Sequence, residues 1–226
     1  MTSLAPRARN RMAKERRILD SALKVFANQG YSGASMDAIA ALAGVSKPTL
    51  YQYFGSKEQL FATLMVEQRD SMLGAFEEPD GLGLVAELWA FAWHYADTVL
   101  HPDFLSLARL TIGEAQRFPE IGRAYQAAGP ERVLRGMMDY LNAKKAEGRL
   151  AFDDAELAAE DLWGLILSAP RNRALHDAAS LPKRDDLHRF VTNGLRVFLK
   201  AYSTNPGHDL AQLTALAEQG PTTGTP

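Results

Sequence analysis

The stretch Ser35–Lys57, SMDAIAALAGVSKPTLYQYFGSK, determines the fold of this chain. Apolar residues in its first part recur on one helical face: Met36, Ile39, Ala40 and Ala43. Gly44 then supplies the backbone freedom that a sharp turn requires. The pattern predicts a short helix that ends in a tight turn.

A second short helix follows the turn. Ser46 is suited to cap it, and Pro48 falls in the first turn, where a missing N–H costs little. Leu50 and Phe54 are four residues apart and form its apolar face. Polar side chains occupy the other face: Lys47, Thr49, Gln52 and Tyr53. This is the layout of a helix-turn-helix, whose second helix enters a DNA major groove. The alternative is an ordinary helical hairpin, but the segment 44–56 contains no acidic residue, which favours a surface that meets phosphates.

The segment 45–60, VSKPTLYQYFGSKEQL, resembles the core of the TetR family of transcriptional regulators. The Tyr-x-Tyr-Phe run followed by Ser-Lys-Glu carries the resemblance, which extends over roughly residues 15–64. The segment 117–150, RFPEIGRAYQAAGPERVLRGMMDYLNAKKAEGRL, resembles the AefR-like subgroup. The resemblance implies an all-α homodimer that binds a near-palindromic double-stranded operator. It also implies that a small-molecule effector in the body releases the DNA.

The same resemblance implies DNA contacts along this stretch. Ser35 and Tyr53 would contact phosphates, and Lys57 would form an ion pair with a phosphate. Gln52 is the best candidate for reading adenine, because its amide matches the base edge. The complete set of expected DNA-binding residues is Ser35, Ser46, Lys47, Thr49, Tyr51, Gln52, Tyr53 and Lys57. Pro48 stands where many members have glycine and cannot donate a backbone N–H to DNA.

Composition excludes several classes of protein. The 226 residues are 46% hydrophobic and 23% charged, which is typical of a soluble globular protein. The absence of cysteine rules out disulfides and thiolate sites, and no run is long enough to span a bilayer. Residues 1–57 hold nine basic and three acidic residues, so +6, against 16 and 24 in the remainder, so −8. A basic head on an acidic body fits a cytoplasmic protein that meets a polyanion at one end.

Helical periodicity continues to about residue 202 and shows no alternating strand pattern. We expect an all-α fold with a three-helix helix-turn-helix domain and a larger ligand-binding and dimerisation bundle. The expected helices span residues 11–28, 36–43, 47–54, 56–76, 84–100, 102–117, 119–128, 133–146, 154–175 and 185–202, and Asp153 is the expected cap of the helix that starts at 154. The expected domains are a flexible basic arm at 1–10, the DNA-binding domain at 11–56, the bundle at 57–202 and a flexible tail at 203–226. Within that tail, a short turn at residues 210–216 is left open as an alternative.

A ligand site in such a bundle needs a cavity lined by apolar groups and a few polar ones. The candidate residues are Trp89, Trp93, His94, Phe104, Arg109, Glu114, Tyr125, Met138 and Trp163. For each aromatic residue, packing in the core is the more common role. Dimerisation should use the last two long helices, through Leu162, Leu165, Ile166, Ala169, Phe190, Leu195, Phe198 and Leu199.

Other functions remain open at this stage. His94, Asp97 and His101 lie on one helical face, as a metal-dependent helical enzyme would require, although a solvated histidine is more common. The chain shows no Gly-rich phosphate loop and no nucleophile–base pattern, so we expect no enzyme, no metal and no cofactor. With the same DNA-binding head, the protein would alternatively be an activator or a DNA-binding protein that ignores ligands.

Overall fold

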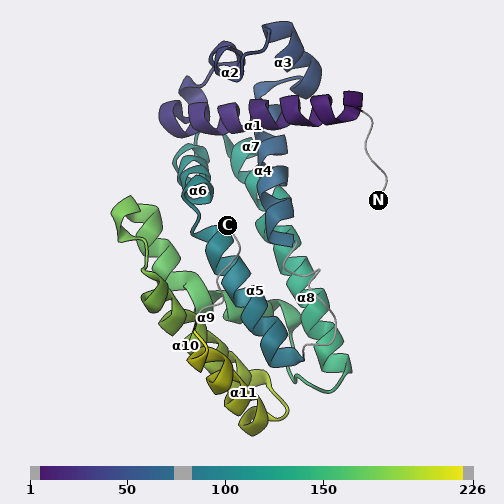
Figure 1. The fold of residues 1–226 in the computed structure, drawn as a ribbon, viewed down its shortest axis with the longest axis vertical. Helices are drawn as coiled ribbons and strands as arrows, with labels where there is room; N and C mark the ends of the chain where they lie inside the picture. The colour runs from purple at the N-terminus through teal and green to yellow at the C-terminus, as the bar shows by residue number, and fades with distance from the viewer. Residues whose placement is uncertain (1–5, 74–82, 221–226) are drawn as a thin grey trace. The chain divides into compact units, whose positions relative to one another are not determined.

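A computed structural model describes residues 6–73 and 83–220 (Figure 1). The regular structure of these ranges is helical, apart from an isolated bridge between Leu150 and Ser203, which confirms the all-α prediction. The chain forms two compact units, which we name the head unit (residues 1–68 and 106–129) and the body unit (69–105 and 130–226). Within the described ranges no helix has the length and apolarity needed to cross a membrane. The expected end of the linking helix near residue 77 lies outside the described residues.

The head unit is built from consecutive helices at the N-terminus and from two later ones. They are α1 (Pro6–Gly33), α2 (Met36–Ala43), α3 (Lys47–Phe54), most of α4 (Lys57–Leu73), the end of α6 (Pro102–Glu114) and α7 (Pro119–Ala128). Helix α1 begins at Pro6, so the predicted flexible arm is wrong for residues 6–10. Helix α1 bends at Gly30, whose φ of 71° is favourable only without a Cβ atom.

The core of the head unit extends beyond the three predicted helices. Phe26 lies 5.5 Å from Phe61 of α4 and 5.7 Å from Tyr31, measured between ring centroids. Leu107 and Leu110 of α6 and Ile121 of α7 are buried in the same cluster. The compact unit is therefore larger than the predicted DNA-binding domain at 11–56, because the apolar faces of α6 and α7 complete its core.

The body unit contains α5 (Leu84–Val99), α8 (Pro130–Ala146), α9 (Ala155–His176), the short 3₁₀ helix η2 (Ala178–Ser180), α10 (Arg184–Tyr202) and α11 (Pro206–Glu218). Helix α9 is capped by Asp154 rather than by the predicted Asp153. Its carboxylate accepts hydrogen bonds from the backbone N–H groups of Glu156 at 2.8 Å and Leu157 at 3.1 Å. Helices α9 and α10 approach closely, since a Cβ atom added at Gly194 would lie 2.8 Å from the backbone of Leu165.

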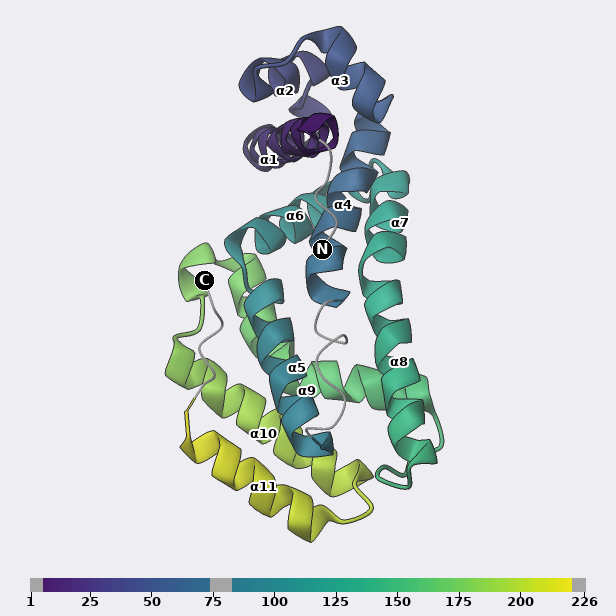
Figure 2. The ribbon, with the colours of Figure 1, turned by 45° about the vertical axis from the view of Figure 1, so that its right-hand side comes forward.

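Helix α11 contradicts the predicted flexible tail over residues 206–218 (Figure 2). It lies along α10, with Leu213 buried. Asp209 in its first turn is 1% exposed, and its carboxylate accepts from the Ser203 hydroxyl at 2.6 Å and from Arg149 at 3.4 Å. The segment 206–218 is thus ordered by a buried polar anchor that composition alone does not indicate.

Most of the predicted dimer-interface residues belong to the core of the subunit itself. Five of the eight are fully buried within the body unit: Leu162, Ile166, Leu195, Phe198 and Leu199. They cannot contact a partner chain in this conformation, so the prediction is corrected for them. Ala169 is exposed, while Leu165 and Phe190 are half-buried. The periodicity identified the apolar faces of α9 and α10, but these faces point into the bundle.

Candidate nucleic-acid interface

Local hydrogen bonds set the geometry of the α2–α3 turn. The Ser35 hydroxyl accepts the Ala38 N–H at 3.1 Å at the start of α2. Gly44 ends α2 with a φ of 63°, and the Ser46 hydroxyl accepts the Thr49 N–H at 3.3 Å at the start of α3. The predicted caps and turn are confirmed.

Helix α3 has one buried face and one exposed polar face. Leu50 and Phe54 are buried in the head unit. Lys47, Tyr51 and Gln52 are exposed, and Thr49 and Tyr53 are half-buried. The Thr49 hydroxyl lies 2.8 Å from the Ser46 hydroxyl, so the two form a pair at the start of the helix. This polar face can present hydrogen-bond donors and acceptors to a DNA groove.

Lys47 is held by an acidic residue of the preceding helix. Its Nζ lies 2.9 Å from Oδ1 of Asp37, and the hydrogen bond to Asp37 raises the pKa of Lys47. Both side chains are more than half exposed. Exposed ion pairs contribute little to stability, so separating Lys47 from Asp37 costs little free energy.

Lys57 contacts the backbone at the junction between α1 and α2. Its Nζ donates to the carbonyl oxygens of Tyr31 at 2.9 Å and Ala34 at 3.0 Å, and it lies 4.5 Å from the centre of the Tyr31 ring. The side chain is half-buried. This ammonium group therefore holds the entry to α2 in place, a role that the resemblance did not suggest.

The first turns of α1 add cations to this surface, and of these Arg9 belongs to the predicted flexible arm at 1–10. Arg9, Arg11 and Lys14 are exposed, and no acidic residue occurs in the first turn of the helix. The guanidinium carbon of Arg11 lies 5.8 Å from the centre of the Tyr53 ring on α3. This contact brings the basic start of α1 next to the helix expected to read DNA.

The predicted ligand-binding residues fall in both units. Six belong to the body unit: Trp89, Trp93, His94, Phe104, Met138 and Trp163. Trp89 and Trp93 are buried and pack edge to face, with ring centroids 5.9 Å apart. Trp163 stacks on Tyr95 at 5.9 Å. These three indole rings thus pack against aromatic neighbours, which is the more common role of such residues.

The other three, Arg109, Glu114 and Tyr125, belong to the head unit. Arg109 and Glu114 of α6 line a hollow of about 470 Å³ beside Phe26 and Gly30 of α1. Glu114 accepts the Ser32 N–H at 3.3 Å. Glu114 therefore contacts the segment that leads into α2.

Sequence reasoning missed a polar cluster between α5 and α8. Glu87 accepts the Tyr140 hydroxyl at 2.8 Å and lies 3.0 Å from Lys144. Burial alone would raise the pKa of Glu87, but hydrogen bonds from Lys144 and Tyr140 outweigh it and lower the pKa. Burial and the nearby Glu87 carboxylate both raise the pKa of Tyr140. No signal in the linear sequence paired these residues, which are about fifty positions apart.

The candidate metal ligands His94, Asp97 and His101 do not form a metal site. Asp97 forms an ion pair with Arg184, whose guanidinium carbon lies 4.1 Å from the centre of the Trp93 ring. The Nδ1 atom of His101 accepts the Asp103 N–H at 3.3 Å. Across residues 6–73 and 83–220, no three His, Asp or Glu side chains group in a way that could hold a metal ion.

Comparisons with known families agree with this geometry. Residues 18–64 match the family described as bacterial regulatory proteins, tetR family. Residues 86–204 match the AefR-like transcriptional repressor C-terminal domain. Helix α11 lies beyond that second match.

A curated relative of this chain is also a transcriptional regulator. The HTH-type transcriptional repressor NicS of Pseudomonas putida is 34% identical over 96 residues, a match that covers 40% of this chain and 44% of NicS. The chain therefore spans less than half the length of this curated relative.

Two solved structures are similar over most of the chain. A putative TetR-family transcriptional regulator from Mesorhizobium loti superposes with a TM-score of 0.77 at 29% identity, covering 89% of this chain and 100% of that one. The Flavonoid-responsive Regulator FrrA gives 0.71 at 34% identity, covering 85% and 98%. Such proteins are DNA-binding transcriptional regulators and not enzymes. The chain therefore belongs to the TetR family of transcriptional regulators and carries an AefR-like C-terminal domain.

Proposed function

We propose that this protein is a homodimeric repressor that binds a near-palindromic operator through α3 and is released by a small, largely apolar effector. The observation that carries the proposal is the polar face of α3, which presents Lys47, Tyr51 and Gln52 with no acidic residue in the segment 44–56. Lysines and hydroxyls supply sequence-independent phosphate contacts, while an amide reads a base edge. We place this activity in the cytoplasm, where the operator is.

The roles proposed for individual residues follow from their exposure. Gln52 is exposed on α3 and reads an adenine with its amide. Lys47 exchanges Asp37 for a phosphate, and Tyr53 donates its hydroxyl to a phosphate beside Arg11. Lys57 supports DNA binding indirectly by holding the start of α2 in place, because its ammonium group donates to two backbone carbonyl oxygens.

The dimer surface we propose is the outer face of the α9–α10 pair. Leu157 on α9 is 63% exposed and Val197 on α10 is 40% exposed, both large apolar side chains. Gly164 and Ala169 are exposed on α9 and allow close approach of a second helix pair. A two-fold axis through this face would form a four-helix interface and place two α3 helices on one operator.

The effector is proposed to be small because FrrA, whose structure covers most of this chain, is named as flavonoid-responsive. The response to flavonoids is a property of FrrA and is not proposed for this chain. For this chain we propose an apolar molecule, because the interior of the body unit is built from apolar and aromatic side chains.

Mobility shift over a salt series, with DNA from beside the gene of this protein, tests the proposal. Tight binding that survives excess random DNA and falls steeply with salt supports it. Replacement of Gln52 by alanine should relax preference at one base position at a cost of about 1–3 kcal/mol, with little change in salt dependence. Unchanged base preference in that variant would contradict the assigned reading face.

Transcription from the bound promoter, measured with and without the regulator, separates the repressor from the activator. A repressor lowers transcription and an activator raises it. Release of DNA by an added apolar compound would exclude the alternative that this is a DNA-binding protein unresponsive to ligands.

A further inference from the structure

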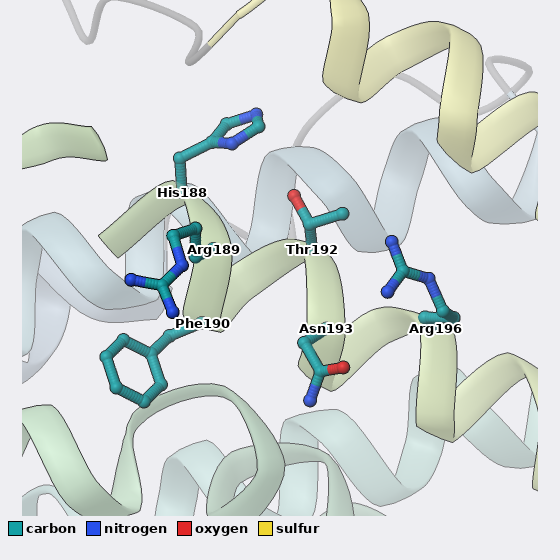
Figure 3. A pocket seen from close by; sticks show the side chains of 6 residues that line it. All are labelled: His188, Arg189, Phe190, Thr192, Asn193 and Arg196. Carbon is teal, nitrogen blue, oxygen red and sulfur yellow. The ribbon is translucent and has the colours of Figure 1, made fainter. Parts of the chain in front are cut away.

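The solvent-facing side of α10 carries a hollow of about 390 Å³ (Figure 3). The hollow borders the face proposed for the dimer, because Phe190 in its lining lies two helical turns before Val197. Its lining within the described residues is His188, Arg189, Phe190, Thr192, Asn193 and Arg196. None of these side chains is acidic, and two are guanidinium groups. Such a lining favours a negatively charged occupant.

The two arginines are differently engaged. Arg189 lies 3.4 Å from Asp186 on the exposed surface, so a neighbouring carboxylate already offsets part of its charge. For Arg196 the described part of the chain offers no carboxylate within ion-pair distance. Figure 3 shows the guanidinium of Arg196 on the same side of α10 as Thr192 and His188. Arg196 is therefore the cation that can accept an anionic partner, and its planar group suits a two-oxygen anion.

Thr192 leaves a hydroxyl group without a partner. It is only 9% exposed, and its Oγ1 atom makes no hydrogen bond. Other helical threonines behave differently, because Thr63, Thr111 and Thr214 each donate to the carbonyl oxygen four residues earlier at 2.9 Å. Buried polar atoms are nearly always paired, so this orphan requires an explanation.

A rotation of the Thr192 side chain about χ1 would give its hydroxyl group a partner. Threonine in a helix occupies two χ1 rotamers, and the second exchanges the positions of its hydroxyl and its methyl group. The Thr192 side chain lines the hollow, so this rotation turns the hydroxyl toward an acceptor placed there. An oxyanion in the hollow would then accept from both Thr192 and Arg196.

A second buried hydrogen-bond donor without a partner lies near the hollow. The Nε1 atom of Trp93 is buried without a hydrogen-bond partner, and its ring centroid is 6.1 Å from that of His188. The Nε2 atom of His188 lies 3.1 Å from the carbonyl oxygen of Ala217, which can only accept, so Nε2 carries the proton. Unpaired donors thus gather around one turn of α10, next to a cationic surface.

We propose that this hollow is a binding site for an oxyanion, with Arg196 and Thr192 as its ligands. Carboxylate and phosphate groups share this chemistry, and both match a guanidinium–hydroxyl pair. The site lies on α10 alone and does not depend on the operator. Its occupancy is measured without DNA, so its failure and the failure of DNA binding are separate results.

Titration of the full-length protein with three probes tests the site. The probes are benzoate, inorganic phosphate and neutral benzamide, followed by calorimetry and by the fluorescence of Trp89 and Trp93, which adjoin His188. We expect saturable binding of benzoate, of phosphate or of both. If the site binds a carboxylate, benzamide should bind at least about tenfold more weakly than benzoate, because it is neutral. Binding of benzoate alone identifies a carboxylate site, and binding of phosphate alone identifies a phosphate site.

Three variants locate the binding. Arg196→Gln and Thr192→Val should each weaken it about tenfold or more, since each removes one donor to the anion. Arg132→Gln is the matched control, because Arg132 lines a separate hollow on α8. Thermal unfolding and sedimentation of each variant show whether its fold and oligomeric state equal those of the parent. Absence of binding by either anion, or equal weakening in the Arg132 control, would overturn the proposal.

Discussion

At the scale of single residues, the two lysines flanking α3 differ in what they hold. Lys47 is exposed and pairs with a side chain, whereas Lys57 is half-buried and pairs with two carbonyl oxygens. Charge alone makes the two look alike in the sequence. The partners show that Lys47 is held only by an exposed carboxylate, whereas Lys57 stabilises the α1–α2 junction. We therefore propose a DNA phosphate as the second partner of Lys47 alone.

This difference predicts opposite behaviour in two variants. Lys57→Met should destabilise the fold by about 1.5–3 kcal/mol, because the hydrogen bonds from a charged donor are removed. Its operator affinity should fall without a change in the salt slope. Lys47→Gln should leave stability nearly unchanged and reduce the slope of log K against log salt by about 0.9 for each phosphate that the lysine neutralises.

Thermal unfolding by circular dichroism and mobility shift at several salt concentrations give both quantities. A reduced salt slope in the Lys57 variant would show that this lysine does bind a phosphate.

At the scale of elements, the start of α1 has an unfavourable charge distribution. Cations at a helix N-terminus oppose the macrodipole, and this helix places Arg9 and Arg11 there with no acidic residue in the first turn. Arg9, Arg11 and Lys14 are exposed, so the core does not hold these side chains. A polyanion nearby would remove the electrostatic conflict.

The combined variant Arg9→Gln and Arg11→Gln should therefore shift two measurements in opposite directions. Helicity of the free protein should rise slightly, since the conflict with the dipole is worth about 0.3–1 kcal/mol for each charge. Operator affinity and its salt slope should both fall. Lys24→Gln, on the same helix but further from its start, is the control for a general charge effect. An unchanged salt slope would exclude phosphate binding by these arginines.

A second prediction at this scale concerns the link between α5 and α8. The pKa of Glu87 is lowered in the folded state, so its ionised form stabilises the fold above the unfolded value of about 4.3 and this contribution disappears as the pH falls toward the lower folded pKa. Glu87→Gln should destabilise the fold by about 1–2 kcal/mol at pH 7.

The stability difference between the parent and this variant should shrink as the pH falls below about 4. Denaturant unfolding at pH values of about 7, 5 and 3.5, on both sides of the unfolded pKa, measures it. The exposed Glu147, which also lies near Lys144, gives a matched control as Glu147→Gln. A difference that stays constant with pH would show that Glu87 contributes through packing and not through its charge.

At the scale of the whole molecule, operator recognition by this protein is proposed to require two copies. Val197 stands on the outer face of α10, where a partner is proposed to bind. Val197→Glu would bury a charge near a two-fold axis and bring it close to its own copy. We expect dimer affinity to fall at least about tenfold, which is about 1.4 kcal/mol, with a parallel decrease in operator binding.

Sedimentation velocity and mobility shift test this expectation together. Leu181→Glu, at a similarly exposed residue between η2 and α10, is the control for added surface charge. A dimer of unchanged affinity in the Val197 variant would move the proposed interface to another face.

Local signals in the amino-acid sequence were sufficient to predict the helix-turn-helix. Serine caps, a turn glycine and apolar residues four apart act within a few positions, so Ser35, Gly44 and Ser46 lie where the pattern predicts. Most helices of the body follow equally from periodicity and proline positions. These features require no knowledge of which element packs on which.

Long-range packing, by contrast, determined what each apolar face and each charge contacts. Periodicity shows that α9 and α10 have apolar faces, but their burial of Leu162 and Phe198 inside the subunit depends on neighbours far along the chain. The carbonyl partners of Lys57, the order of α11 around Asp209 and the Glu87–Lys144 pair are likewise long-range contacts. The physical reason is that helix formation is a local property of the backbone, whereas burial and ion pairing depend on which helices meet.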